Sequence, residues 1–208
     1  MSGYSSGMSF NSGNILKLTS ILSPIIVVFF IVMSSIFNEN IKGLVYLAGI
    51  LIVFMINMFL MNQIKSDAVV KPEQFCSIID FPIFNSPYDT PAPTSVTLAF
   101  TAAYLIIPMI LNSQINYFVL AFFLFIFGVD SFYKVTEECT KTSGVLLGGL
   151  VGIMFAIFWF FVLHINGFDS LLFFNDFQSN RMFCSKPNKQ TFKCSVYKNG
   201  KLISSNVA

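Results

Sequence analysis

Three polar stretches with lysines, hydroxyls and carboxylates separate long apolar segments of the chain. The first, KSDAVVKP, ends with Lys71 and a proline. The second, YDTPAPTS, occupies positions 88–95, and the third, SFYKVTEECTKTSG, contains Glu137 and Glu138. Lysine is a common phosphate ligand, whereas carboxylates repel phosphate. These stretches raise the question of a phosphate site, and Lys71 is its candidate cation.

The first two stretches resemble motifs of the type 2 phosphatidic acid phosphatase superfamily, the helical lipid phosphate phosphatases and haloperoxidases. That family has Lys, six residues and Arg-Pro, and then Pro-Ser-Gly-His at the mouth of a helix. Here Lys71 and Pro72 stand in place of Arg-Pro, and Lys65 is one position too close. At positions 91–94 the sequence PAPT keeps the first proline, and threonine stands in place of histidine. The resemblance covers about residues 62–152.

The third stretch resembles the last motif of that family, which is Ser-Arg, five residues, His, three residues and Asp. Ser131 matches, but Phe132 replaces the arginine, Glu138 the histidine and Thr142 the aspartate. In the family one histidine attacks phosphorus, another protonates the leaving oxygen, and basic groups neutralise the phosphoryl oxygens. Because both histidines are missing here, the resemblance implies a catalytically inactive member without a cofactor, in which Lys71 is a vestigial phosphate ligand.

The second stretch also has a purely structural interpretation. Pro91 and Pro93 end the loop, and Thr94 or Ser95 caps the following helix. A metal site is not expected, because the four cysteines have no histidine partners at zinc spacing and the single histidine is His164. A formal net charge of +2 gives no indication of nucleic-acid binding.

The composition places the chain in a lipid bilayer. Of its 208 residues 55% are hydrophobic and 11% are charged, compared with about 25% charged residues in soluble domains. A bilayer core about 30 Å thick requires about 20 apolar helical residues. We therefore predict an all-α integral membrane bundle of five helices over residues 15–164. The predicted spans are 15–37, 41–61, 95–111, 115–132 and 144–164.

The connections arrange these spans. Short links, NENIK and NSQIN, join the first pair and the second pair, which makes each pair antiparallel neighbours. The longer loops, 62–94 and 133–143, then fall on the same side of the membrane. Residues 1–14 are rich in Gly, Ser and Asn and are predicted to be disordered.

The last span contains GVLLGGLVG, which places Gly144, Gly148 and Gly152 at intervals of four on one helical face. Such a face allows another helix to approach closely. It can serve packing within the bundle or association between chains, and packing within the bundle is favoured. A transport pathway would need ionisable groups inside the spans. Asp130 is the only acidic residue within the predicted spans and lies near the end of one, with Asn57 and Asn62 on or beside the second span as further polar groups.

The segment 165–208 begins with an aromatic stretch suited to the membrane interface and continues as a basic extramembrane tail. The tail contains YKNGKLI, an Asn-Gly hairpin signal. Cys184 and Cys194 lie ten residues apart in it, and either a disulfide that staples the small hairpin or two free thiols is compatible with this spacing. Cys76 and Cys139 lie in the two long loops and can pair if the loops meet.

Basic residues near the ends of the spans predict the orientation. Those on the side of the long loops are Lys17, Lys65, Lys71, Lys134 and Lys141, and those on the other side are Lys42 and Arg181. This count places the long loops, with Cys76 and Cys139, in the reducing cytosol and the tail outside it.

These observations favour a non-catalytic, multi-pass membrane protein with a structural or scaffolding role. Its partners are the lipid bilayer and proteins that contact loop 62–94 and the tail, and nucleic acid is not among them. The abundance of Asn, Phe and Ile and the altered enzyme-like motifs resemble membrane proteins of large DNA viruses, which implies a virion inner membrane beneath a capsid. A lipid phosphate phosphatase with divergent motifs and a small-solute transporter or channel remain the alternatives.

Overall fold

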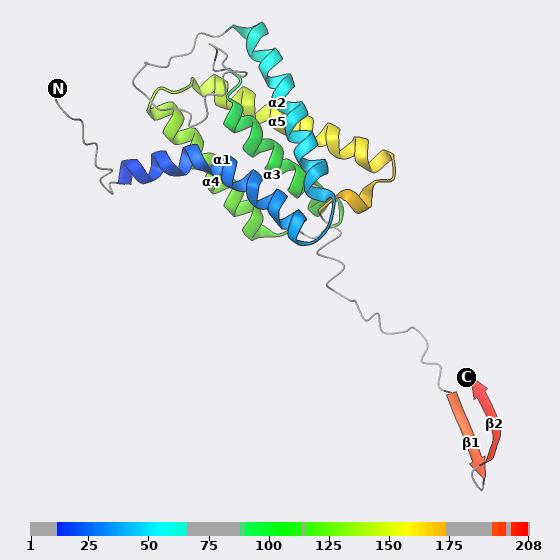
Figure 1. Ribbon diagram of the computed structural model, residues 1–208. Helices are drawn as coiled ribbons and strands as arrows, with labels where there is room; N and C mark the ends of the chain where they lie inside the picture. The colour runs from blue at the N-terminus through cyan, green and yellow to red at the C-terminus, as the bar shows by residue number, and fades with distance from the viewer. Residues whose placement is uncertain are drawn as a thin grey trace. The chain divides into compact units, whose positions relative to one another are not determined.

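The computed structural model describes residues 12–65, 88, 90–113, 115–173, 193–198 and 201–207. Five long helices occupy the larger part of these residues (Figure 1). They are α1 Ser12–Phe37, α2 Lys42–Ile64, α3 Pro93–Leu111, α4 Tyr117–Thr136 and α5 Thr142–Ile165. All five are long and apolar enough to cross a membrane, and the prediction of five spans is confirmed. A short 3-10 helix, η1, follows at Asp169–Leu171.

Four helices extend into the predicted loops, because α2 and α4 end later than predicted and α3 and α5 begin two residues earlier. The α1 helix begins at Ser12, inside the segment 1–14 that was predicted to be disordered. The α2 helix continues to Ile64, beyond the predicted end at residue 61. The α4 helix continues to Thr136, beyond the predicted end at residue 132. Lys134 therefore belongs to a helix, and its side chain is buried. Polar residues ended the predicted spans, but in α4 Ser131 and Lys134 have partners and the helical hydrogen bonds continue past them.

Within the described residues, three helices end in the same backbone motif, although only one of them has glycine at the critical position. The residue after the cap adopts a left-handed conformation, and the next N–H donates to the carbonyl five residues earlier. The left-handed residues are Glu39, Glu138 and Gly167. The closing bonds are Asn40 to Ser35 at 3.1 Å, Cys139 to Lys134 at 2.8 Å and Phe168 to Leu163 at 2.9 Å. This motif satisfies carbonyls that would otherwise lack partners at the helix ends.

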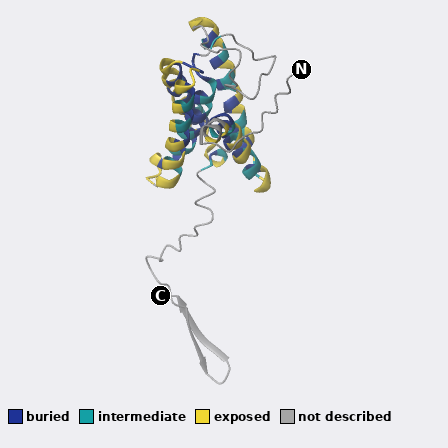
Figure 2. Cartoon of the chain, turned by 90° about the vertical axis from the view of Figure 1, so that its left-hand side faces the viewer, coloured by how far each residue is buried: buried dark blue, intermediate teal, exposed yellow. Residues whose placement is uncertain are grey.

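The α3 helix is the centre of the bundle, because it contacts each of the other four long helices. Its side chains Leu98, Phe100 and Tyr104 are almost completely buried. In Figure 2 the buried residues lie toward the middle of the bundle and the exposed ones along its outer sides. The element that follows the longest loop is therefore the most enclosed one.

Contact between α3 and α5 brings two backbones together. A Cβ atom added to Gly148 would lie 2.8 Å from the Ala92 carbonyl oxygen, and one added to Gly152 would lie 2.5 Å from the Val96 carbonyl oxygen. Because real Cβ atoms do not approach backbone so closely, both positions require glycine in this packing. In addition, the Gly144 carbonyl accepts a hydrogen bond of 3.0 Å from the Ala92 N–H. The structure thus places the glycine stripe against α3 of the same chain.

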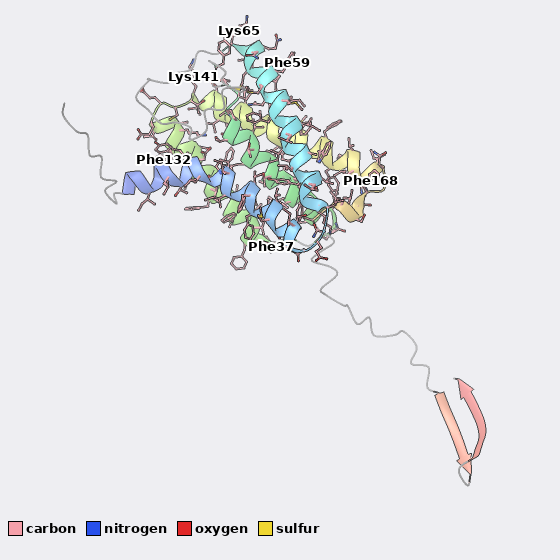
Figure 3. The ribbon with its side chains drawn as sticks, viewed as in Figure 1. Phe37, Phe59, Lys65, Phe132, Lys141 and Phe168 are labelled. Carbon is pink, nitrogen blue, oxygen red and sulfur yellow. The ribbon has the colours of Figure 1, made fainter. Side chains whose placement is uncertain are left out.

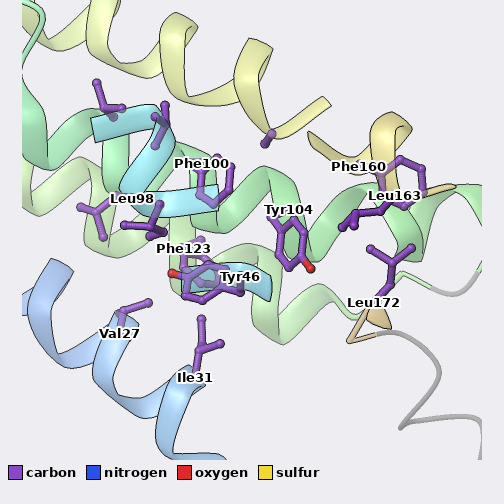
Figure 4. Close-up of a cluster of buried hydrophobic side chains, with 14 of the residues drawn as sticks. Val27, Ile31, Tyr46, Leu98, Phe100, Tyr104, Phe123, Phe160, Leu163 and Leu172 are labelled. Atoms are coloured by element: carbon purple, nitrogen blue, oxygen red, sulfur yellow. The ribbon is translucent and has the colours of Figure 1, made fainter. Parts of the chain in front are cut away.

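An aromatic cluster fills the space beside this contact (Figure 4). Phe100 and Tyr104 stack with ring centroids 5.9 Å apart, and Tyr46 of α2 lies 5.6 Å from Tyr104. The Tyr46 hydroxyl is 2.7 Å from Thr101 Oγ1. Since Thr101 donates its own proton to the Thr97 carbonyl, Tyr46 is the donor to Thr101. This hydrogen bond fixes the ring of a fully buried tyrosine between α2 and α3.

The outer sides of the helices carry large apolar side chains. Phe30 is 71% exposed, Phe118 is 88% exposed and Met154 is 67% exposed. Soluble monomers rarely expose so much contiguous apolar surface, whereas hydrocarbon is a good solvent for it. With the five spans, this surface identifies the chain as a multi-pass membrane protein.

The C-terminal residues 176–208 form a separate unit. Two antiparallel strands are described in it, β1 Lys193–Lys198 and β2 Lys201–Val207. In their register Lys193 pairs with Val207, and a register shift lies between Val196 and Tyr197. The Asn-Gly pair between the strands lies outside the described residues.

The α3–α5 contact gives a prediction with an internal control. Gly152→Ala should destabilise the bundle by about 1–3 kcal/mol, because its methyl group would meet α3 backbone. Gly128 on α4 has no atom within 4 Å of an added Cβ, so Gly128→Ala should leave stability unchanged or raise it by up to roughly 1 kcal/mol. Thermal unfolding of both variants in the same detergent would measure this. Equal midpoints for the two variants would contradict the close α3–α5 packing.

Candidate functional site

Asp130 and Lys134 form a buried ion pair one turn apart on α4. Lys134 Nζ lies 3.4 Å from Asp130 Oδ1, and the two side chains are 7% and 0% exposed. An ionisable group within a membrane span is costly unless it is paired, and it is a candidate functional residue. This pair is therefore the starting point for the site.

Hydroxyl groups from two other helices complete the environment of Asp130. Ser20 on α1 donates to Oδ1 at 2.7 Å, and Thr94 on α3 donates to Oδ2 at 3.1 Å. Lys134 Nζ in turn donates to Thr94 Oγ1. We call Ser20, Thr94, Asp130 and Lys134 the Asp130 network. Its hydrogen bonds join α1, α3 and α4 and compensate the negative charge of the carboxylate.

The position of Thr94 corrects one sequence-based prediction. We expected Thr94 or Ser95 to cap α3, but the N-cap is Ala92 and no side chain forms a capping hydrogen bond. Pro93 occupies the first turn, where its missing N–H costs nothing. The Thr94 hydroxyl is directed to the buried carboxylate of Asp130, and the buried Ser95 hydroxyl has no hydrogen-bond partner.

The turn before α3 is held by one hydrogen bond to α2 and another to the start of α5. Asn57 of α2 donates from Nδ2 to the Pro91 carbonyl at 3.2 Å. From the other side, the Ala92 N–H donates to the Gly144 carbonyl at the start of α5. Asn57 is completely buried, and its side chain makes this hydrogen bond within the core of the bundle. These contacts fix the first turn of α3 and with it the position of Thr94.

The other residues of the phosphatase-like motifs do not converge on this network in a catalytic arrangement. Ser131 donates to the Phe127 carbonyl of its own helix at 2.6 Å. Phe132 is exposed on α4, Glu138 lies in the turn after α4, and Thr142 is an exposed residue at the start of α5. Lys71, the candidate phosphate ligand, lies outside the described residues.

The tail cysteines also lie beyond what the structure can place. Cys184 is outside the described residues, and of Cys194 only the backbone in β1 is described. The predicted Cys184–Cys194 disulfide therefore stays a prediction. Within the described residues, no three His, Cys, Asp or Glu side chains gather into a possible metal site.

His164 lies at the other end of α5. Its Nδ1 is 2.6 Å from Asp169 Oδ1, and its ring stacks on Phe160 with centroids 5.6 Å apart. It follows Thr142 by 22 residues, which corresponds to a rise of about 33 Å along the helix. The histidine therefore cannot act as a nucleophile in a site that Thr94 and the loops would form.

Comparisons with known proteins give no relative from which a role could be transferred. No family model, curated protein or solved structure matches this chain. The functional argument therefore depends on the contacts described above.

Sequence reasoning identified Asp130 but missed its partners. Lys134 was counted as a loop cation, although its spacing of four residues from Asp130 on one helix was a usable signal. Ser20 lies 110 positions from Asp130 in the sequence, and nothing in its neighbours indicates the contact. Thr94 was considered only as a cap or as a replacement for a family histidine.

Two chemical roles are compatible with the Asp130 network. A hydroxyl between an amine and a carboxylate is the pattern of an activated nucleophile, and Thr94 occupies that position. However, Asp130 is fully buried and accepts from two hydroxyls, and the Thr94 proton is already donated to it. A buried ion pair with these hydrogen bonds can equally hold three helices in register. The closed pattern favours this structural role.

The structural role predicts strong coupling between Asp130 and Lys134. Asp130→Asn keeps the shape but leaves Lys134 without its counter-charge, and it should destabilise the bundle by about 3–5 kcal/mol. Asp130→Asn combined with Lys134→Met removes both charges and should recover most of that loss. Unfolding of the single and double variants in detergent would measure the coupling.

Lys141→Met provides the control for this comparison. Lys141 is an exposed residue at the N-cap of α5, and its substitution should change the free energy of unfolding by less than about 0.5 kcal/mol. If Asp130→Asn behaves like Lys141→Met, the ion pair does not stabilise the fold.

Proposed function

We propose that this protein is a non-catalytic structural component of a membrane, which acts through helix packing and through contacts of its extramembrane segments. The observation that carries this proposal is the closed hydrogen-bonding of the Asp130 network. Ser20, Thr94 and Lys134 all direct donors toward one another or toward Asp130. A network that uses its polar groups in this way joins helices and leaves few donors or acceptors that could bind a substrate.

The chemistry around Thr94 supports the inactive interpretation of the phosphatase-like motifs. Where the family has a nucleophilic histidine, this chain has a hydroxyl bonded to a buried carboxylate. A phosphate group at this position would approach the negative charge of Asp130, which is unfavourable. A phosphohistidine intermediate would also require His164, which is at the far end of α5.

The extramembrane segments are the proposed contact surfaces. The last residues of loop 62–94 include the turn at Pro91 and Ala92 that Asn57 and Gly144 hold, so a partner bound to the loop would act on a rigid attachment point. The tail contributes a small extramembrane β-hairpin, for which the antiparallel pairing of β1 and β2 is the support. The compositional resemblance to membrane proteins of large DNA viruses extends the proposal to a virion inner membrane.

Three assays, each on the wild-type protein and on one double variant, separate the proposed role from its alternatives. The double variant Asp130→Asn with Lys134→Met should fold but lacks the buried charges. If the protein is a structural component, mild detergent extraction of its native membrane should recover it in a larger assembly. This assembly should have the same size for the wild-type protein and for the double variant. Neither protein should release phosphate from a phosphatidic acid analogue, and neither should increase solute flux in liposomes.

The contrary results identify the alternatives. Phosphate release that is lost in Lys71→Ala or Thr94→Val would establish a divergent phosphatase. Solute flux by the wild-type protein that disappears in the double variant would establish a transporter that uses the ion pair. Extraction as a lone, monodisperse protein would remove the support for a scaffold.

A further inference from the structure

An apolar crevice of about 360 Å³ lies between α2 and α5. It is lined by Ile56 of α2 and by five residues of α5, which are Leu150, Val151, Met154, Phe155 and Phe158. Leu150, Met154 and Phe158 are 59%, 67% and 58% exposed, so the crevice is continuous with the apolar outer surface of the bundle. In a bilayer this surface faces hydrocarbon, and the molecule that hydrocarbon offers to an apolar crevice is an acyl chain.

The crevice has a closed end and an open end. At its closed end α2 and α5 touch where they cross (Figure 1), and a Cβ atom added to Gly49 would lie 2.9 Å from Trp159 Nε1. From this contact Ile56 is further along α2, and Leu150 is further back along α5. The crevice therefore extends toward the end of the bundle at which α2 ends and α5 begins. We call this end the loop end.

Each wall of the crevice carries one exposed lysine at the loop end. Lys65 is the C-cap of α2 and Lys141 is the N-cap of α5, and Figure 3 shows both toward the same end. Within the described residues neither lysine forms an ion pair.

The spacing along the helices places these lysines at the depth of lipid headgroups. Ile56 precedes Lys65 by nine residues, and Leu150 follows Lys141 by nine residues, which corresponds to about 13 Å along each helix. Half of the hydrocarbon core measures about 15 Å. When the crevice lies at the depth of acyl chains, both lysines therefore lie near the boundary of the core, where phosphate groups begin.

We propose that the crevice binds one acyl chain of an anionic phospholipid, whose phosphate group lies at the level of Lys65 and Lys141. Lysine binds phosphate as a point charge, and basic sites between transmembrane helices bind acidic headgroups. Glu137 and Glu138 are at the same end, but they follow α4, which does not line the crevice. The charge beside the crevice is therefore positive, and it favours an anionic lipid over a zwitterionic one with the same chain.

The proposed lipid site agrees with the orientation predicted from basic residues. That count places the loop end in the cytosol, and the cytoplasmic leaflet is the one that contains anionic lipids. The site is separate from the Asp130 network, which joins α1, α3 and α4. A bound acyl chain would instead fill the space that side chains leave open between α2 and α5.

Trp159 is the single tryptophan of the chain and reports on the crevice. Its ring stacks on Phe155, a residue of the crevice wall, with centroids 6.3 Å apart. Bromine atoms on an acyl chain quench tryptophan fluorescence by contact. The full-length protein is reconstituted in phosphatidylcholine that contains the same fraction of either brominated phosphatidylglycerol or brominated phosphatidylcholine.

Brominated phosphatidylglycerol should quench Trp159 more strongly, because one lysine near an anionic surface contributes a preference of about fivefold. Equal quenching by the two lipids would overturn the proposal. So would the absence of quenching by either lipid, because protein from the loop or from a second copy would then cover the crevice.

The two lysines are tested against a charge control at the same end. Lys65→Gln with Lys141→Gln should abolish the preference for phosphatidylglycerol and leave quenching by brominated phosphatidylcholine unchanged. Glu137→Gln also changes the charge of the loop end, but away from the crevice, and it should leave the preference unchanged. If Glu137→Gln raises the preference by the factor that one lysine contributes, general surface charge causes the selectivity and the proposal fails.

The crevice itself is tested by filling it. Ile56→Phe with Leu150→Phe places two rings in the crevice and should reduce quenching by both brominated lipids. Ile26→Phe with Leu124→Phe adds the same bulk to exposed positions of α1 and α4 and should quench like the wild-type protein. Equal quenching of the two double variants would show that the acyl chain does not occupy the crevice.

Discussion

The close contact between α3 and α5 is the constraint on which the rest of the bundle depends. Gly148 and Gly152 let the two backbones meet, and van der Waals contact of this kind is one of the forces that drive helix association in a bilayer. The contact holds α3 in the middle of the bundle, where it meets every other long helix. With α3 so placed, its first turn presents Thr94 to α4 and its aromatic residues to α2.

Hydrocarbon as a solvent explains how the polar groups are used. No water is available inside the bilayer to satisfy a buried carboxylate or a free carbonyl, so partners have to come from the chain itself. Asp130 obtains them from Ser20, Thr94 and Lys134 on three helices. The helix ends obtain them from left-handed terminal motifs. The same rule that makes an isolated charge costly makes a completed network an effective connection between helices.

A protein organised in this way is suited to hold a fixed shape in a membrane. Its outer surface is apolar and aromatic, the buried charges of Asp130 and Lys134 compensate each other, and its one histidine lies at the opposite end of α5 from Thr142. The proposed structural role depends on the hydrogen bonds and the ion pair of the Asp130 network.

The sequence alone determined the features that depend on composition and local spacing. Runs of apolar residues defined the five spans, and the spacing of Gly144, Gly148 and Gly152 defined a close-packing face. It could not determine which helix that face meets, or that Lys134 belongs inside α4 with Asp130 and hydroxyls from α1 and α3. Those contacts join residues far apart in the chain, and only the packed bundle brings them within hydrogen-bonding distance. A bilayer requires that buried polar groups find partners, but the tertiary structure decides which partners they are.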